Sequence, residues 1–156
     1  MKRHAIPIVM SVLTLAILLP SSVFAQDTPG VTGAGAAALP ANSALSGVSL
    51  SGMQFGVSVY IPGDATAEGQ LQATLLGTTS LGLTQNIELL GTATSGSNAT
   101  GTRTFSGTAI VDMGDGTLPL TNVPISVTVT STSLSLTIGT TNLPAATLTG
   151  GVITIE

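Results

Sequence analysis

The chain has 156 residues, with three basic and seven acidic side chains and neither cysteine nor tryptophan. From residue 26 onward it has no lysine or histidine, and one cation, Arg103, stands against all seven acids for a formal charge of −6. Such a chain cannot neutralise the phosphates of a nucleic acid, form a polybasic patch on a membrane or be stabilised by disulfides.

The first 25 residues predict a secretory signal peptide. Lys2 and Arg3 precede an apolar stretch from Ala5 to Leu19, and the small-residue sequence VFA ends at Ala25. The apolar stretch is shorter than the roughly 20 residues of a membrane-spanning helix, and Pro20 follows it at once. We therefore expect cleavage after Ala25, a secreted, extracellular or cell-surface location, and no membrane span in the mature chain.

Residues 26–44, QDTPGVTGAGAAALPANSA, are small residues interrupted by glycine and proline. They show neither the period of a strand nor that of a helix. Such a stretch buries too little apolar area to order itself. We predict a flexible leader over residues 26–44, followed by one all-β domain over residues 45–156.

From residue 45 the chain alternates apolar with small or hydroxyl-bearing residues, a pattern typical of half-buried strands. The apolar residues that share a face in successive segments are Phe55, Val57, Val59 and Ile61; Leu71, Ala73 and Leu75; Leu81, Leu83, Ile87 and Leu89; and Phe105, Ala109 and Val111. No window has a helical period. The sequence predicts about eight to ten short antiparallel strands in a single β-sandwich, with a closed antiparallel β-barrel as the alternative.

Three dipeptides are candidate hairpin turns in the last third of the chain: Asp115-Gly116, Ser131-Thr132 and Gly150-Gly151. Folding at each one brings apolar residues together on one face. The pairs that this predicts are Val111 with Leu120, Met113 with Leu118, Val129 with Leu134, Val127 with Leu136, Ile125 with Ile138, and Leu148 with Ile153. We therefore expect a meander of antiparallel strands over residues 102–155.

Asp112 and Asp115 are the candidate metal ligands, and Asp64 is a third acid that the fold could bring to them. Calcium is the metal that such oxygen atoms would hold. Asp-Gly is also a strong turn signal, with Asp115 at the tip and Asp112 on the outer face of the predicted hairpin. Turn chemistry explains both aspartates without a ligand, so we predict a hairpin that folds without metal or cofactor.

Catalysis is not expected, because after residue 26 a serine nucleophile would find no histidine or lysine as a partner base. Arg103 shares the parity of Phe105 and is expected to reach solvent or pair with a carboxylate at a strand end. Its alternative role is to anchor an anionic ligand. The sequence thus predicts neither catalytic nor cofactor-binding residues.

The expected function is that of a non-catalytic, acidic, threonine-rich extracellular module that acts as a surface, matrix, assembly or interaction component. The alternative is a carrier barrel that binds a small apolar ligand in an internal cavity. The partner would be a surface or a protein. Self-association through edge strands is a further possibility, with residues 152–156, VITIE, as the candidate edge.

Overall fold

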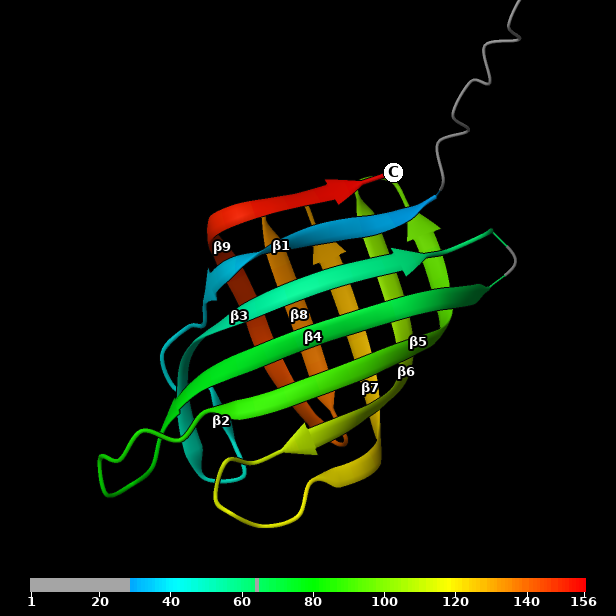
Figure 1. Ribbon diagram of the computed structural model, residues 1–156. Coiled ribbons are helices and arrows are strands. Elements are labelled where there is room, and N and C mark those ends of the chain that lie inside the picture. Colours follow the sequence, from blue (N-terminus) through cyan, green and yellow to red (C-terminus); the bar gives the residue numbers. More distant parts are fainter. Residues whose placement is uncertain (1–28, 64) are drawn as a thin grey trace, which may run out of the picture.

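Nine β-strands and no helix occur in residues 29–63 and 65–156, the part of the chain that the computed structural model describes (Figure 1). The strands are β1 (Gly30–Ala38), β2 (Ala44–Leu45), β3 (Val48–Tyr60), β4 (Thr66–Thr78), β5 (Ile87–Ala99), β6 (Thr102–Asp112), β7 (Leu120–Thr130), β8 (Ser133–Ile138) and β9 (Thr141–Ile155). All pairings between them are antiparallel. The predicted all-β class and number of strands are confirmed.

Strand pairing runs without a break around eight of these strands. Neighbours follow one another from β3 to β9, and β1 pairs with both β9 and β3. The remaining strand, β2, adds a two-residue pairing to β3. The sheet therefore closes on itself through β1.

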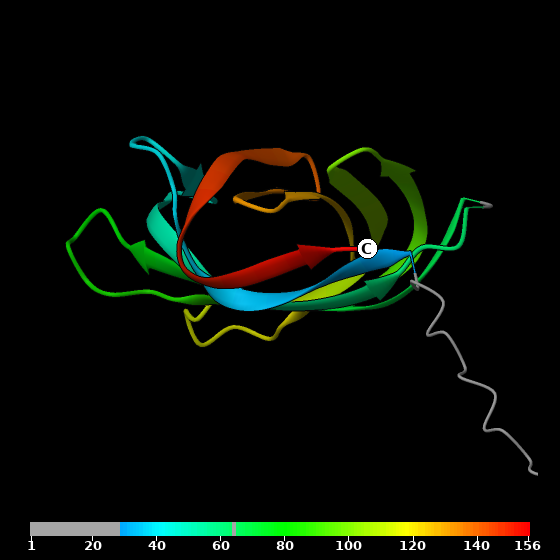
Figure 2. The same cartoon turned by 90° about the horizontal axis from the view of Figure 1, so that it is seen from above.

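The closed sheet is flattened into two layers (Figures 1 and 2). β1, β3 and β4 run across one layer, and β7 and β8 run behind them at a steep angle, while β5 and β6 curve around one side and β9 around the other. The structure thus combines the two facing layers of the predicted sandwich with the continuous pairing of its alternative.

Alternation places the predicted apolar residues between the layers. Phe105, Leu71, Leu75, Ile87 and Leu89 are among the largest fully buried side chains. Their neighbours in sequence point outward, because successive side chains of a strand lie on opposite faces. Packing between the two layers therefore fixes which residues form the two outer faces.

The predicted flexible leader is wrong for residues 30–38, which form β1. This strand lies between β3 and β9 and pairs with both along its length. Its inward glycines let the neighbouring strands approach, since a Cβ at Gly33 or Gly35 would overlap the carbonyl oxygen of Val152 or Gly150. Backbone pairing on both sides orders β1. Its side chains alternate too weakly for the sequence pattern to indicate a strand. The all-β domain accordingly includes residues before 45.

The predicted hairpin at Gly150-Gly151 is also wrong, because β9 continues through it from Thr141 to Ile155. The first part of β9 pairs with β8 as far as Thr147, and the part from Thr147 onward pairs with β1. Gly151 has a positive φ of 95°, and a Cβ there would overlap the backbone of Ala34. The glycine pair marks the place where β9 bends from one layer to the other.

The predicted turn at Ser131-Thr132 is confirmed, with all three of its predicted pairs. Val129 pairs with Leu134, Val127 with Leu136, and Ile125 with Ile138. By contrast, the strand predicted around Leu81 and Leu83 does not form, and both side chains are exposed in the loop between β4 and β5. Ile87 and Leu89 begin the next strand and are buried.

No helix within residues 29–63 and 65–156 has the length and apolarity required to cross a membrane. The predicted signal peptide, residues 1–25, and Asp64 lie outside the described residues. Cleavage after Ala25 stays a prediction.

Candidate functional site

Asp112 and Asp115 serve the turn between β6 and β7. Asp112 Oδ1 accepts a hydrogen bond from the N–H of Gly114 at 2.9 Å. Asp115 Oδ1 accepts from the N–H of Thr117 at 2.9 Å and from its hydroxyl at 2.7 Å. The Thr117 hydroxyl, followed by its N–H, holds the pKa of Asp115 below the ordinary value for this carboxyl.

This turn is larger than the predicted two-residue hairpin. Val111 does pair with Leu120 as predicted, but pairing stops there and residues 113–119 form a loop. Leu118 is 89% exposed, so its predicted pairing with Met113 does not occur. Gln85 Nε2 donates to the Met113 carbonyl oxygen at 2.8 Å and ties this loop to the one between β4 and β5.

Among the described residues, no three acidic side chains gather where they could hold a metal ion. Asp112 and Asp115 each direct an oxygen at a backbone N–H of their own turn. Asp64, the third candidate, lies outside the described residues. Local turn chemistry therefore accounts for Asp112 and Asp115.

Arg103 joins the start of β6 to the end of β9. Its guanidinium donates to the carbonyl oxygens of Ala99 at 2.9 Å and Thr102 at 3.0 Å, and to the backbone oxygen of Glu156. Its Nε is buried without a hydrogen-bond partner. Arg103 thus lies at a strand end, where its guanidinium binds backbone oxygens.

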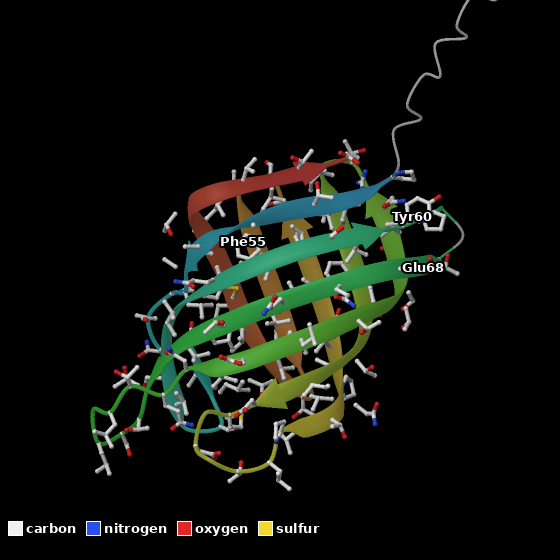
Figure 3. The ribbon with its side chains drawn as sticks, viewed as in Figure 1. Phe55, Tyr60 and Glu68 are labelled. Carbon is white, nitrogen blue, oxygen red and sulfur yellow. The ribbon has the colours of Figure 1, made fainter. Side chains whose placement is uncertain are left out.

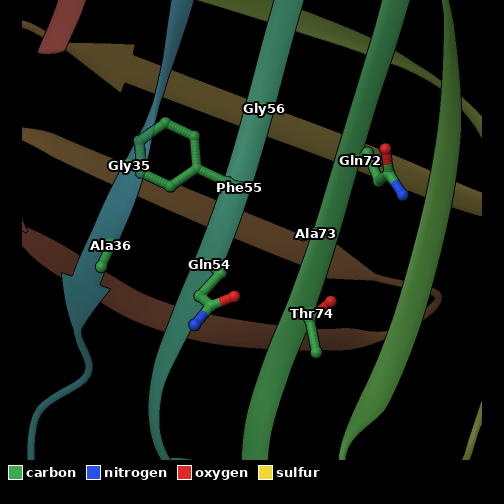
Figure 4. Close-up of a pocket in the computed structure, with 8 residues that line it drawn as sticks. All are labelled: Gly35, Ala36, Gln54, Phe55, Gly56, Gln72, Ala73 and Thr74. Carbon is green, nitrogen blue, oxygen red and sulfur yellow. The ribbon is translucent and has the colours of Figure 1, made fainter. Parts of the chain in front are cut away.

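A shallow groove crosses the outer face of the layer that contains β1, β3 and β4. Its first part, a hollow of about 440 Å³, is lined by Gly35, Ala36, Gln54, Phe55, Gly56, Gln72, Ala73 and Thr74 (Figure 4). A second hollow of about 320 Å³ shares Gln72, Ala73 and Thr74 with the first and continues to Glu88, Leu90, Ile110, Asp112 and Pro119. We call this continuous depression the cross-strand groove.

Strand register builds the cross-strand groove from two parallel rows of outward residues. One row runs Ala36, Gln54, Thr74, Glu88, Asp112, and each member is the direct cross-strand partner of the next. The other row runs Ala34, Gly56, Gln72, Leu90, Ile110. Gly56 leaves a gap in the second row, because a Cβ there would meet no heavy atom within 4 Å.

Asp112 bonds within its own turn, but the other four polar side chains of the groove have no internal partner. Gln54, Gln72, Thr74 and Glu88 line the groove and form no side-chain hydrogen bond with any described residue. Leu90 and Ile110, 47% and 46% exposed, make one end of the groove apolar. Amides and hydroxyls that can both donate and accept thus lie next to a small apolar surface.

Aromatic side chains contribute little to this face. Tyr60 is the one exposed aromatic residue among those described, and it pairs with Glu68 at the far end of β3 and β4 (Figure 3). Phe55 lies beneath the face and is buried. A ligand in the groove would therefore meet amides, hydroxyls, carboxylates and aliphatic carbon.

The opposite layer has a different outer face, which we call the hydroxyl face. Its residues form cross-strand rows on β6, β7 and β8: Thr104, Thr128 and Ser135 in one, and Ser106, Ser126 and Thr137 in the next. All six are half-buried. Several bond to one another or to a neighbour, including Thr104 with Thr128 at 3.3 Å and Ser106 with Ser95 at 2.8 Å.

Sequence reasoning missed the groove residues. The alternation of Gln70 and Gln72 with Leu71 and Ala73 marks the glutamines as outward-facing. It does not reveal that Gln72 adjoins Gly56 on one strand and Leu90 on another. Only the register of five strands brings these residues together.

Comparison of the chain with models of known protein families, with curated proteins and with solved structures finds no significant match. The assignment of function therefore rests on the residues of the groove and on the chemistry they allow.

Proposed function

We propose that this chain is a non-catalytic, secreted binding module that makes contact with an extracellular surface or polymer through the cross-strand groove. The observation that carries the proposal is the set of polar groove side chains without internal partners. Unpaired donors and acceptors in a hollow favour a ligand that bonds to them. The predicted signal peptide supports the secreted location in this proposal.

The chemistry of the groove supports binding without catalysis. Thr74 is its one hydroxyl, and no histidine, lysine or cysteine occurs among the described residues to activate it. Glu88 and Asp112 are adjacent cross-strand neighbours on an open face that does not exclude water. We therefore expect no hydrolytic activity.

The packed interior supports surface contact over carriage of an apolar ligand. Large side chains such as Phe105, Leu136 and Leu143 fill the space between the layers and are almost completely buried. A carrier would need that space for its ligand. The groove lies outside the core, on the surface of the sheet.

Self-association is a second candidate, because β9 has an open side. Beyond Thr147, β9 pairs with β1 alone among the described strands. Gly30 and Glu156 exchange hydrogen bonds of 3.2 and 3.1 Å, so the alternate residues Ile153 and Ile155 direct their backbone groups away from β1. Those groups could pair with a second copy of the chain.

The open side of β9 can be tested by adding charge to it. Val152→Lys places a cation on an exposed position of the edge and should reduce self-association without unfolding the protein. Thr92→Lys adds the same charge to β5, which has a neighbour on both sides, and serves as the control. Sedimentation velocity measures both. A wild-type protein that stays monomeric at high concentration rejects this second candidate.

The main proposal can be tested with dyes, because the chain contains no cysteine. Gln70→Cys places an environment-sensitive dye at the rim of the groove, and Ser135→Cys places the same dye on the hydroxyl face. Each protein is mixed with a neutral polysaccharide, an acidic polysaccharide, unfolded casein and phospholipid vesicles. At least one probe should change the fluorescence at the groove alone. An equal response on both faces, or no response to any probe, rejects the proposal.

A further inference from the structure

We propose that the cross-strand groove takes a neutral, extended polysaccharide whose chain lies across the strands of the sheet. This inference rests on the function proposed above and adds the class of ligand. Three observations carry it: the charge around the groove, the spacing of its polar side chains, and the position of its apolar end.

Charge excludes anionic polymers from the groove. The two charged residues that line it, Glu88 and Asp112, are both acidic. Arg103 is the single cation among the described residues, and its guanidinium is bonded to three backbone oxygens away from the groove. Phosphate, sulfate or carboxylate groups would therefore meet repulsion with no compensating partner. A neutral ligand meets no such cost.

Spacing favours a sugar polymer over an extended peptide. Gln54, Thr74, Glu88 and Asp112 stand on four adjacent strands in direct register, which spaces them by about 4.8 Å. This step is close to the length of one hexose unit in an extended glucan. An extended peptide advances by about 3.3 Å per residue, so its backbone groups would fall out of step with the row.

The kinds of side chain also match a sugar. Each glutamine amide offers two donors and one acceptor, and the Thr74 hydroxyl can do either, as sugar hydroxyls require. Leu90, Ile110 and Pro119 form an apolar end against which the C–H faces of a sugar ring can pack. The groove is shallow and open along its length, which suits a segment of a long polymer.

Gly56→Gln tests the inference by filling the groove. Gly56 does not have a positive φ, and its Cβ would point into open space, so the fold should tolerate the new side chain. Thr92→Gln adds the same side chain to an exposed, outward position on β5 outside the groove and is the matched control. Circular dichroism and urea unfolding should show both variants folded.

Binding is measured by biolayer interferometry on immobilised hydroxyethyl cellulose, dextran, alginate and unfolded casein. The wild type should bind at least one of the two neutral glucans, with little change between low and high salt. Gly56→Gln should weaken this binding by about tenfold, as loss of one or two hydrogen bonds would. Thr92→Gln should leave it unchanged.

Three results would overturn the inference, and they differ in what they leave standing. Groove-dependent binding to alginate or casein without binding to a neutral glucan rejects the class of ligand but retains the contact function. Failure to bind any probe, together with a silent groove dye, rejects both. Glucan binding that Gly56→Gln does not weaken moves the site away from the groove and also overturns the inference.

Discussion

The two outer faces of this sheet follow the same strand pattern, yet their polar side chains have different partners. On the hydroxyl face, Thr104 bonds to Thr128 and Ser106 bonds to Ser95. On the grooved face, Gln54 and Gln72 have no hydrogen-bond partner among the described residues. A surface rich in hydroxyls can thus be satisfied by its own cross-strand pairs, whereas unpaired amides beside a glycine line the hollow that we propose as the binding site.

The largest difference in unfolding free energy is expected between alanine substitutions at two mid-strand glycines, Gly107 and Gly56. A Cβ at Gly107 of β6 would overlap the Thr92 carbonyl oxygen of β5, whereas a Cβ at Gly56 would meet nothing. Gly107→Ala should cost about 1–3 kcal/mol of unfolding free energy or more, because the strands cannot separate without breaking their pairing. Gly56→Ala should be neutral or stabilise by up to about 1 kcal/mol. Urea unfolding of both variants measures the difference, and equal effects would contradict the described packing.

Arg103→Met should have the next largest effect, since Arg103 joins the strand end of the hydroxyl layer to the end of β9. The variant loses three hydrogen bonds from a charged donor to backbone oxygens. We expect a loss of about 2 kcal/mol of unfolding free energy. Thermal unfolding in low and high salt is the measurement. A stability equal to that of the wild type would show that these bonds contribute nothing.

A smaller difference in unfolding free energy is expected when the same Thr→Val substitution is made on each outer face. Thr128→Val removes a hydroxyl that bonds to Thr104, and should cost about 0.5–1 kcal/mol. Thr74→Val removes a hydroxyl without an internal partner and should stay within about 0.5 kcal/mol of the wild type. Guanidinium unfolding measures both. If Thr74→Val costs as much as Thr128→Val, the difference between the faces is not one of internal bonding.

The smallest effect concerns acid stability. The pKa of Asp115 is lower in the folded protein than its ordinary value of 3.8, so its bonds to Thr117 stabilise the fold above that pH. This contribution is lost as the pH falls through the lowered pKa. The wild type should therefore lose slightly more stability than Asp115→Ala between pH 5 and pH 2, by urea unfolding at each pH. Because turn bonds account for Asp112 and Asp115, we also expect a chelator to leave the melting temperature of the wild type unchanged; a large drop would make Asp112 and Asp115 calcium ligands.

Much of the meander could be predicted from local signals. The turn at Ser131-Thr132 and its three apolar pairs follow from alternation, because a one-residue slip would send apolar residues to the outer face. At Gly150-Gly151 the same argument gave a self-consistent but wrong hairpin. A glycine pair fits a tight turn or a bend in a continuous strand equally well, and the partner strand β1 decided between them.

The two aspartates and the cross-strand groove differ in the same way: local sequence explains the aspartates, and distant strands build the groove. The roles of Asp112 and Asp115 lie within their own turn, so sequence reasoning reached the turn, although not its length. The groove residues come from strands β1, β3, β4, β5 and β6, and nothing local connects them. Gln54 and Thr74 become neighbours only through the register of β3 with β4.

The sequence by itself determined the all-β class, most of the residues that face the core, and the lack of histidine, lysine and cysteine after residue 26. These follow from composition and from the pleat of a strand, which are local. Tertiary structure alone decided the closure of the sheet through β1, the bend of β9 at Gly150-Gly151 and the cross-strand groove. Each of these depends on which distant strands exchange backbone hydrogen bonds, and backbone groups are the same in every residue except proline.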